Sequence, residues 1–368
     1  MGNILPPGSV VGIVGGGQLG RMLATAAARL GLRASIFEPQ KDAPAFDAAA
    51  FRHCAPYDDV SALEAFAQEA DVVTLEFENV PVSALEIIER YTPVFPPRQA
   101  LQVAQDRIAE KAFITSLGLP LGAYEPVEGA DALGEAYARL VARAPGTAYL
   151  KRARHGYDGK GQMRLVSADD IPAAESWLGA ETAVLEAAVP FAMEISMLAV
   201  RGADGAMAFY DPPHNTHAEG ILRECLVPAP ISAATRTQAE NYARRIAEAL
   251  DYVGVLAIEL FLVREADGNE HLLLNEIAPR VHNSGHWTAD TCTVGQFENH
   301  IRAVAGWPLG STARHSEARM VNLLGHEALE WRTLLTDNPA RMLTLYGKSD
   351  VRSGRKMGHY VDLSPLVK

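Results

Sequence analysis

Two apolar runs late in the chain, separated by a short polar stretch, predict a β-hairpin. Residues 254–263 and 271–277 are rich in aliphatic side chains, and each run contains one glutamate. The Asp-Gly dipeptide at 267–268 is typical of two-residue hairpin turns, and such a turn places Glu259 directly opposite Glu276. Facing carboxylates repel each other, so the pair predicts a shared divalent cation. Magnesium is usually held by one or two carboxylates plus nucleotide phosphates. The alternative is a turn one residue longer, which would break this register and leave one glutamate facing solvent.

The second run ends in a polar loop. Arg280, His282 and Asn283 follow the strand within a few positions. Loops that follow core strands often carry binding and catalytic groups. This loop is therefore a candidate catalytic site.

A second pattern lies at the N-terminus. An apolar strand at 10–14 is followed by a glycine-rich turn at 15–20, a helix at 21–30, and a strand at 34–37 that ends at Glu38. This order matches the dinucleotide-binding fingerprint, which indicates an NAD-dependent oxidoreductase. The rest of the chain offers no matching set of hydride-transfer residues. The same turn can instead hold another phosphate or form only a tight connection.

Charged residues at two further places could either bind a ligand or simply face solvent. The strand at 72–78 ends in Glu76 and Glu78, which predicts either a ligand crevice at the end of a parallel sheet or a solvated loop. Residues 98–117 read as one helix, and most of its charges would normally face solvent.

A glycine-rich basic loop joins two predicted strands in the middle of the chain. The strand at 148–151 ends in Lys151, and a strand at 163–166 follows residues 152–162. The loop is not a Walker loop, because no Ser or Thr follows its Gly-Lys and no helix comes next. It resembles a flexible lid over nucleotide phosphates, and the alternative is an ordinary mobile hairpin.

Two polar clusters remain. His214 and His217 have the residue type of metal ligands, but no third ligand is evident, so we expect polar contacts there rather than zinc. Near the C-terminus, strands at 320–324 and 342–346 precede a basic segment that contains Arg355 and Lys356. That segment predicts an anion site or a solvated turn.

Composition narrows the function classes. The 368 residues suit two or three domains, and a net charge of −12 argues against nucleic acid or an anionic membrane as a partner. Three scattered cysteines fit a reducing cytoplasm. No apolar run is long enough to cross a bilayer, and the N-terminus lacks a signal pattern.

Taken together, these segments resemble the ATP-grasp superfamily, and within it the 5-(carboxyamino)imidazole ribonucleotide synthase family of purine biosynthesis. The resemblance covers nearly the whole chain, and its carriers are residues 17–21, 76–80, 156–162, 275–287 and 355–359. One departure is that relatives often have two glycines before the Tyr-Asp pair, whereas His155 occupies the first of those positions here.

The resemblance implies a fold and a reaction. The fold class is α/β, α+β overall: a Rossmann-like pre-ATP-grasp domain, an ATP-grasp fold and a small C-terminal β-rich domain. The implied domains are residues 1–110, the small lobe with its lid loop at 111–185, the large lobe at 186–312, and the C-terminal domain at 313–368. The implied reaction is ATP-dependent carboxylation of 5-aminoimidazole ribonucleotide by bicarbonate, through carboxyphosphate, in a cytoplasmic homodimer. The cofactors are ATP and magnesium.

The resemblance also implies residue roles. Glu259 and Glu276 hold magnesium. Arg280, His282 and Asn283 surround bicarbonate, because an arginine fork suits an oxyanion and a histidine can move a proton near neutral pH. The implied ATP-binding residues are Arg107, Lys151, Gly156, Tyr157, Asp158, Gly159, Lys160, Gly161, Gln162, Glu186, Ala187, Val189, Glu194, His217, Asn275 and Glu276. The implied ribonucleotide-binding residues are Gln18, Leu19, Glu76, Tyr157, Asp158, Arg355 and Lys356.

Other functions stay open at this point. Another ATP-grasp ligase, similar to a formate-dependent glycinamide ribonucleotide transformylase or a biotin carboxylase, would share the nucleotide site. Residues 76–79 and 355–359 favour the imidazole substrate. An NAD-dependent oxidoreductase is a less favoured alternative, and a non-catalytic nucleotide-binding regulator would not need the complete set of phosphate, metal and bicarbonate residues.

Overall fold

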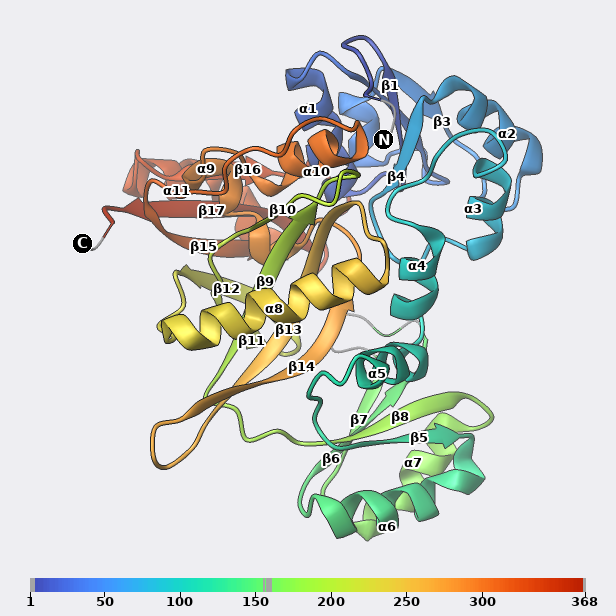
Figure 1. The fold of residues 1–368 in the computed structure, drawn as a ribbon, viewed down its shortest axis with the longest axis vertical. Coiled ribbons are helices and arrows are strands. Elements are labelled where there is room, and N and C mark those ends of the chain that lie inside the picture. Colours follow the sequence, from blue (N-terminus) through green and yellow to red (C-terminus); the bar gives the residue numbers. More distant parts are fainter. Residues whose placement is uncertain (1–3, 155, 157–160, 367–368) are drawn as a thin grey trace.

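The computed structural model describes residues 4–154, 156 and 161–366. Figure 1 shows an N-terminal domain in blue, a smaller lobe in green at the opposite end, and a large sheet between them that continues into the red C-terminal strands. No helix in the described part of the chain has the length and apolar character needed to span a membrane.

The N-terminal domain is built on a parallel sheet in the order β3-β2-β1-β4. Its elements are β1 (Val10–Val14), α1 (Gln18–Arg29), β2 (Arg33–Phe37), β3 (Phe51–His53), α2 (Val60–Glu69), β4 (Val72–Leu75) and α3 (Val82–Ile88). Every residue of β1 and β4 is buried. The reason is that α1 and α10 (Gln296–Val304) pack on one face of the sheet, and α2 and α3 pack on the other.

The predicted single helix over 98–117 is wrong, because two helices meet there. Helix α4 (Arg98–Ala104) ends before Asp106, and α5 (Arg107–Ser116) begins after it. Asp106 has an extended backbone, and its Oδ1 accepts hydrogen bonds from the N–H groups of Ile108 and Ala109 at 2.9 and 3.3 Å. Asp106 is thus the N-cap of α5, and a capping residue needs a non-helical backbone.

The small lobe consists of an antiparallel sheet in the order β5-β8-β6-β7 and two helices. Its elements are β5 (Tyr124–Glu128), α6 (Leu133–Arg143), β6 (Ala148–Arg152), β7 (Gln162–Leu165), α7 (Ile171–Leu178) and β8 (Thr182–Ala187). Strands β6 and β7 flank the glycine-rich loop. His155 and residues 157–160 of that loop lie outside the described residues.

Within the described residues, the large sheet has nine antiparallel strands in the order β14-β13-β9-β11-β12-β15-β17-β16, with β10 paired to β9. The strands are β9 (Met193–Arg201), β10 (Met207–Phe209), β11 (His214–Ala218), β12 (Ile221–Val227), β13 (Gly254–Arg264), β14 (Glu270–Ala278), β15 (Glu317–Leu324), β16 (Met342–Leu345) and β17 (Lys356–Ser364). The C-terminal strands β15, β16 and β17 therefore extend the sheet of the large lobe instead of forming a separate sheet.

Helix α8 (Ala233–Ala249) packs along β9 and β13 (Figure 1). The other helices here are α9 (Thr288–Thr291) and α11 (Trp331–Asp337). The chain's short 3₁₀ helices are η1 (Pro44–Ala48), η2 (Ala130–Ala132), η3 (Ala168–Asp170), η4 (Asn283–Gly285) and η5 (Gly325–Glu330).

The hairpin of β13 and β14 pairs Glu259 with Glu276, as predicted, but by a different route. The turn is longer than two residues, because Arg264 pairs with Glu270 and Gly268 has a φ of 87°. A register shift after Glu259 compensates for the longer turn and leaves Asn275 as an extra residue in β14. Such bulges re-aim side chains beside active sites.

Candidate active site

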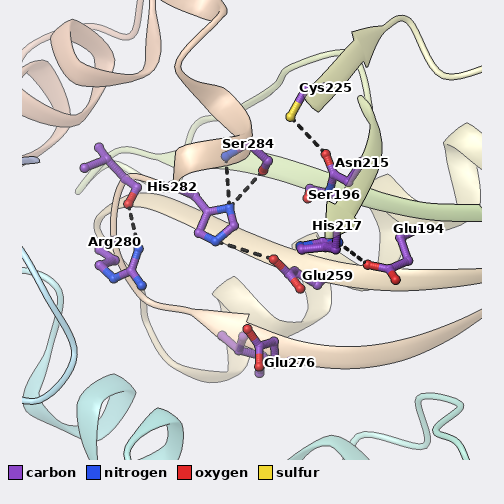
Figure 2. A network of polar contacts seen from close by, with 12 residues as sticks. Glu194, Ser196, Asn215, His217, Cys225, Glu259, Glu276, Arg280, His282 and Ser284 are labelled. Atoms are coloured by element: carbon purple, nitrogen blue, oxygen red, sulfur yellow. Dashed lines mark hydrogen bonds and ion pairs between the residues drawn. The ribbon is translucent and has the colours of Figure 1, made fainter. Parts of the chain in front are cut away.

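The two facing carboxylates lie at the end of the hairpin next to the polar loop (Figure 2). Burial and the neighbouring Glu276 carboxylate raise the pKa of Glu259. His282 Nε2 is 3.5 Å from Glu259 Oε1, and Arg107 Nη1 is 3.3 Å from Glu276 Oε2. Two carboxylates placed this close concentrate negative charge, so the position suits a cation.

Arg280 is held at the start of the loop by two acceptors. Its Nε donates to the carboxylate of Glu78, and its Nη1 donates to the Val281 carbonyl at 3.2 Å. Burial opposes the charge of Glu78, but the Arg280 guanidinium outweighs it and holds the pKa of Glu78 at about 2. The guanidinium is therefore fixed beside the carboxylate pair by a residue from the N-terminal domain.

His282 is neutral and oriented as a hydrogen-bond donor toward the carboxylates. Burial, together with the positive charges of Arg280 and Lys356, lowers its pKa to about 3. The N–H and Oγ of Ser284 lie 3.4 and 2.8 Å from His282 Nδ1. Because the Ser284 N–H donates to Nδ1, the ring proton is on Nε2, which points to Glu259 (Figure 2). This histidine therefore offers a proton on Nε2 and has no charge to lose near neutral pH.

The side chain of Asn283 has unused hydrogen-bonding capacity. Its amide oxygen and nitrogen are both buried, and no described residue bonds to either atom. Buried polar atoms normally have partners, so an unpartnered amide in this position indicates a site for a polar ligand.

Three charged side chains, one buried and two half-buried, lie together on the small-lobe side. Glu186 at the end of β8 contacts Lys151 Nζ at 2.9 Å and Lys111 Nζ at 3.0 Å. Burial opposes its charge, but the two lysines lower the pKa of Glu186 to about 2. On the same helix α5 as Lys111, the buried Glu110 accepts a hydrogen bond from the Ile277 N–H at 2.6 Å. Helix α5 thus fixes the strand that carries Glu276.

Glu194 and His217 form a further pair on neighbouring strands β9 and β11. His217 Nδ1 is 2.6 Å from Glu194 Oε2 (Figure 2). Burial opposes the charge of His217, but the bond to Glu194 raises its pKa above the ordinary value. The contact is polar, as expected. His214 is also a residue of β11, but it is not part of the Glu194–His217 pair.

Comparison with known proteins identifies the family. The ATP-grasp domain family matches residues 112–297, the ribonucleotide synthetase preATP-grasp domain matches 9–105, and the phosphoribosylaminoimidazole carboxylase C-terminal domain matches 318–363. The N5-carboxyaminoimidazole ribonucleotide synthase of Brucella melitensis biotype 1 is 46% identical over 363 residues, which cover 98% of each chain. The chain belongs to the N5-carboxyaminoimidazole ribonucleotide synthase family.

Solved structures of this family agree with the fold. The Thermus thermophilus synthetase has a TM-score of 0.87 and 45% identity, covering 96% of this chain and 93% of that one. The Aspergillus clavatus synthase, solved with ADP and 5-aminoimidazole ribonucleotide, has a TM-score of 0.89 and 28% identity, covering 98% of this chain and 94% of that one. The predicted fold class, an ATP-grasp fold with a pre-ATP-grasp domain and a C-terminal domain, is confirmed.

The N-terminal turn of this synthase-family chain is closed by its own carboxylates. The Gly16 N–H donates to Glu38 at 2.8 Å, and the Gly17 N–H donates to Glu76. A Cβ on Gly17 would lie 2.2 Å from Glu76 Oε1, so a larger residue there would displace that carboxylate. A bound pyrophosphate would need these N–H groups as donors. Here the groups already donate to two carboxylates, whose negative charge would repel a pyrophosphate. The NAD-dependent alternative is therefore wrong.

The C-terminal basic segment meets the N-terminal domain. Ser349 Oγ donates to Asp42 Oδ2 at 2.8 Å, and Arg355 Nη1 donates to the Asp350 carbonyl at 2.8 Å. A Cβ on Gly347 would lie 2.5 Å from Arg21 Nη1. The Lys348 ammonium donates to the Lys356 carbonyl at 2.8 Å. Arginines and lysines from two domains thus converge at this junction.

The remaining predicted residues have simple positions. Gln18 and Leu19 are the first residues of α1, Ala187 ends β8, Val189 follows it and lies beside Gly122, and Gln162 begins β7 after Gly161. Gly156 is described, whereas Tyr157, Asp158, Gly159 and Lys160 lie outside the described residues.

The sequence reasoning assigned no role in the site to three ionisable residues, Glu110, Lys111 and Lys348. Positions 107, 110 and 111 lie on one face of a helix, which is a usable signal. That face was interpreted as solvated, but Glu110 and Lys111 are only 2% and 3% exposed. Their partners Ile277 and Glu186 are distant in sequence, so local pattern alone could not reveal the pairing.

Proposed function

We propose that this protein carboxylates 5-aminoimidazole ribonucleotide with bicarbonate, at the expense of ATP, to give N5-carboxyaminoimidazole ribonucleotide, ADP and phosphate. The observation that carries the proposal is the placement of Arg280, His282 and Asn283 directly beside the Glu259–Glu276 pair. Bicarbonate is a poor electrophile, and phosphorylation to carboxyphosphate makes its carbon reactive toward the amine. Homologues carry the name of this activity, and one was solved with ADP and the ribonucleotide.

The donor set fits magnesium. Within the described residues, no group of three or more His, Cys, Asp or Glu side chains could hold a metal ion. A site of only two carboxylates suits a hard cation that completes its shell with water and nucleotide phosphates. Glu259 and Glu276 would hold the ion, which would neutralise the charge that develops on the transferred phosphoryl group. The proximity of the two carboxylates, which raises the pKa of Glu259, also favours such a cation.

On the ATP side, Arg107, Lys151 and the loop from Gly156 to Gln162 bind phosphates. Glu186, Ala187 and Val189 meet the adenine, Glu194 and His217 meet the ribose side of the nucleotide, and Asn275 lies at the phosphate end. In this structure Lys151 pairs with Glu186. Phosphate binding would draw Lys151 away, and Lys111 would keep Glu186 compensated. Charge compensation of this kind is the main contribution of the protein to phosphoryl transfer.

On the bicarbonate side, the Arg280 guanidinium binds the oxyanion, while the Nε2–H of His282 and the unpartnered amide of Asn283 donate or accept further hydrogen bonds. Because the His282 ring is neutral and its Nδ1 accepts a hydrogen bond, His282 acts in this structure as a hydrogen-bond donor through Nε2. The expectation from the sequence that His282 moves a proton near neutral pH stays a prediction.

The ribonucleotide occupies the junction of the N-terminal and C-terminal domains. Gln18, Leu19 and Glu76 contact it from the first domain, and Tyr157 and Asp158 face the aminoimidazole. Arg355 and Lys356 bind its phosphate, and Lys348 beside Lys356 adds a further positive charge. The contact between Ser349 and Asp42 supports a shared site at this junction.

We further propose a homodimer that acts in the cytoplasm, as the family resemblance implies. Cys54, Cys225 and Cys292 are free thiols, which fits a reducing compartment. A different ATP-grasp ligase function is less well supported, because relatives of the same name match almost the full length of this chain.

Phosphate release from ATP tests the proposal when magnesium, bicarbonate and the ribonucleotide are omitted one at a time. Release that needs all three, together with an acid-labile carbamate product, supports it. Release with glycinamide ribonucleotide and formate, or with biotin, in place of the aminoimidazole would reject the substrate and keep the ATP-grasp chemistry.

A further inference from the structure

The side chain of Gln296, the first residue of α10, is completely buried beneath the loop that carries His282. Its Oε1 accepts a hydrogen bond from the His282 N–H at 2.9 Å, and its Nε2 donates to the His282 carbonyl at 2.8 Å. Its second N–H faces His286 Nδ1 at 3.2 Å. Both N–H groups and the oxygen of the amide are thus engaged, and only this orientation lets the oxygen accept from the His282 N–H.

The same helix end also holds the far side of the loop. The Gln296 N–H donates to Thr288 Oγ1 at 2.9 Å, and Thr288 Oγ1 donates to the Gly285 carbonyl at 2.7 Å. A Cβ on Gly285 would lie 2.1 Å from Leu198 Cδ2 and 2.9 Å from Gln296 Cδ. Glycine at this position therefore allows the loop to lie directly on the glutamine.

These contacts leave His282 little freedom. Gln296 fixes its backbone, and Ser284 fixes its Nδ1, so the direction of the Nε2–H toward Glu259 is determined at both ends. None of the Gln296 contacts involves the carboxylates or Arg280. The glutamine can influence the site only through the loop.

We infer that Gln296 is a positioning residue for bicarbonate, which acts by holding the backbone of His282 so that its Nε2–H meets the bound anion. This inference rests on the proposed role of His282 at the bicarbonate site. Hydrogen-bond donors contribute to catalysis when they are preorganised, and a displacement of about 1 Å can cost about a hundredfold in rate. Loss of the glutamine amide removes two of the bonds that prevent such a displacement.

Asn299 on the same helix provides a matched control. It is also completely buried. Its Oδ1 accepts from the Gly310 N–H at 2.7 Å, and its Nδ2 donates to the Gly310 carbonyl at 3.2 Å. The two side chains thus make the same kind of backbone clamp, but Asn299 holds a loop that carries none of the proposed site residues.

The test compares full-length Gln296→Met and Asn299→Leu with wild type. Melting temperature, kcat and the KM values for bicarbonate, ATP and the ribonucleotide are measured for each protein. Both variants should melt at lower temperature. Only Gln296→Met should raise the KM for bicarbonate, by about tenfold or more, while the KM for ATP stays unchanged. If Gln296→Met does not fold, Gln296→Glu replaces it, because this variant keeps an acceptor for the His282 N–H and loses the amide N–H donors.

A double variant separates this role from general stability. In a His282→Asn background, Gln296→Met should have no further effect on the bicarbonate KM, because residues that act through one another are not additive. A bicarbonate KM that changes no more in Gln296→Met than in Asn299→Leu would overturn the inference, even if His282→Asn raises that KM. Wild-type turnover that does not depend on bicarbonate would instead overturn the proposed function itself.

Discussion

His300 on α10 joins three elements deep inside the protein and predicts a specific pH dependence of stability. Its Nε2 is 2.7 Å from Thr74 Oγ1 on β4, and its Nδ1 accepts from the Val255 N–H on β13 at 3.0 Å. A Cβ on Gly254 would lie 2.8 Å from the ring, so the backbone packs directly against it. A proton on Nδ1 would face the Val255 N–H, and the charged ring has no acceptor at that position.

The structure gives the sign and size of the effect. Burial lowers the pKa of His300 from 6.5 to about 3. The folded state therefore binds fewer protons than the unfolded state between these values, and stability is lost as the pH falls below 6.5. Between pH 7.5 and pH 5.0, protonation of this one residue in the unfolded chain costs about 2 kcal/mol, since each pH unit below 6.5 is worth about 1.4 kcal/mol.

The perturbation is His300→Gln, which removes the titratable ring. Urea unfolding of the full chain, followed by circular dichroism at pH 7.5 and 5.0, measures the free energy of unfolding. The wild type should be the more stable protein at pH 7.5, and its advantage should shrink by about 2 kcal/mol at pH 5.0. The other buried histidines titrate in both proteins, so their contributions to the free energy of unfolding cancel in the difference between the two. An advantage that is the same at both pH values would refute the reasoning.

Three further predictions concern the site. Glu276→Gln removes one of the facing carboxylates, so magnesium-dependent turnover should fall by about a hundredfold or more with an unchanged circular dichroism spectrum; normal turnover would reject the metal role. Lys356→Ala should raise the KM for the ribonucleotide far more than that for ATP in steady-state assays, and equal effects would count against a phosphate contact. Gly17→Ala adds a Cβ 2.2 Å from Glu76 Oε1. It should lower the free energy of unfolding by about 1–3 kcal/mol and raise the KM for the ribonucleotide. If calorimetry shows that the variant is folded and its KM is unchanged, Glu76 does not contribute to ribonucleotide binding.

The hairpin shows what local pattern can predict. The two apolar runs and the Asp-Gly dipeptide placed Glu259 opposite Glu276, although the turn is longer than predicted and a bulge at Asn275 restores the register. A bulge has no clear signature in a short aliphatic run. The predicted pairing is therefore correct because the longer turn and the bulge shift the register by one residue in opposite directions.

Polar contacts between residues far apart in the chain explain what the sequence could not show. Glu78 and Arg280 are 202 residues apart, and Glu110 and Ile277 are 167 apart. Glu78, Arg280 and Glu110 alone have the character of solvated surface groups, and only the fold brings each to its buried counterpart. The glycine turn failed in the same way: its spacing fits a dinucleotide, but the tertiary structure fills it with Glu38 and Glu76.

The helix break at Asp106 was visible in principle. An aspartate directly before a helical segment, with an acidic residue in the first turn of that segment, is a recognisable N-terminal signal. The apolar residues on both sides of residue 106 concealed it, because Ala100 of α4 and Ile114 of α5 are buried in the same hydrophobic core.

In the proposed mechanism, ATP activates bicarbonate at the loop of Arg280, His282 and Asn283. Bicarbonate labelled with ¹⁸O in all positions tests it most directly, by mass spectrometry of the phosphate released during turnover with the ribonucleotide. Attack of a bicarbonate oxygen on the γ-phosphorus, followed by cleavage of the carbon–oxygen bond, leaves one labelled oxygen in each phosphate, and the account predicts this result. Phosphate without label from bicarbonate would contradict it.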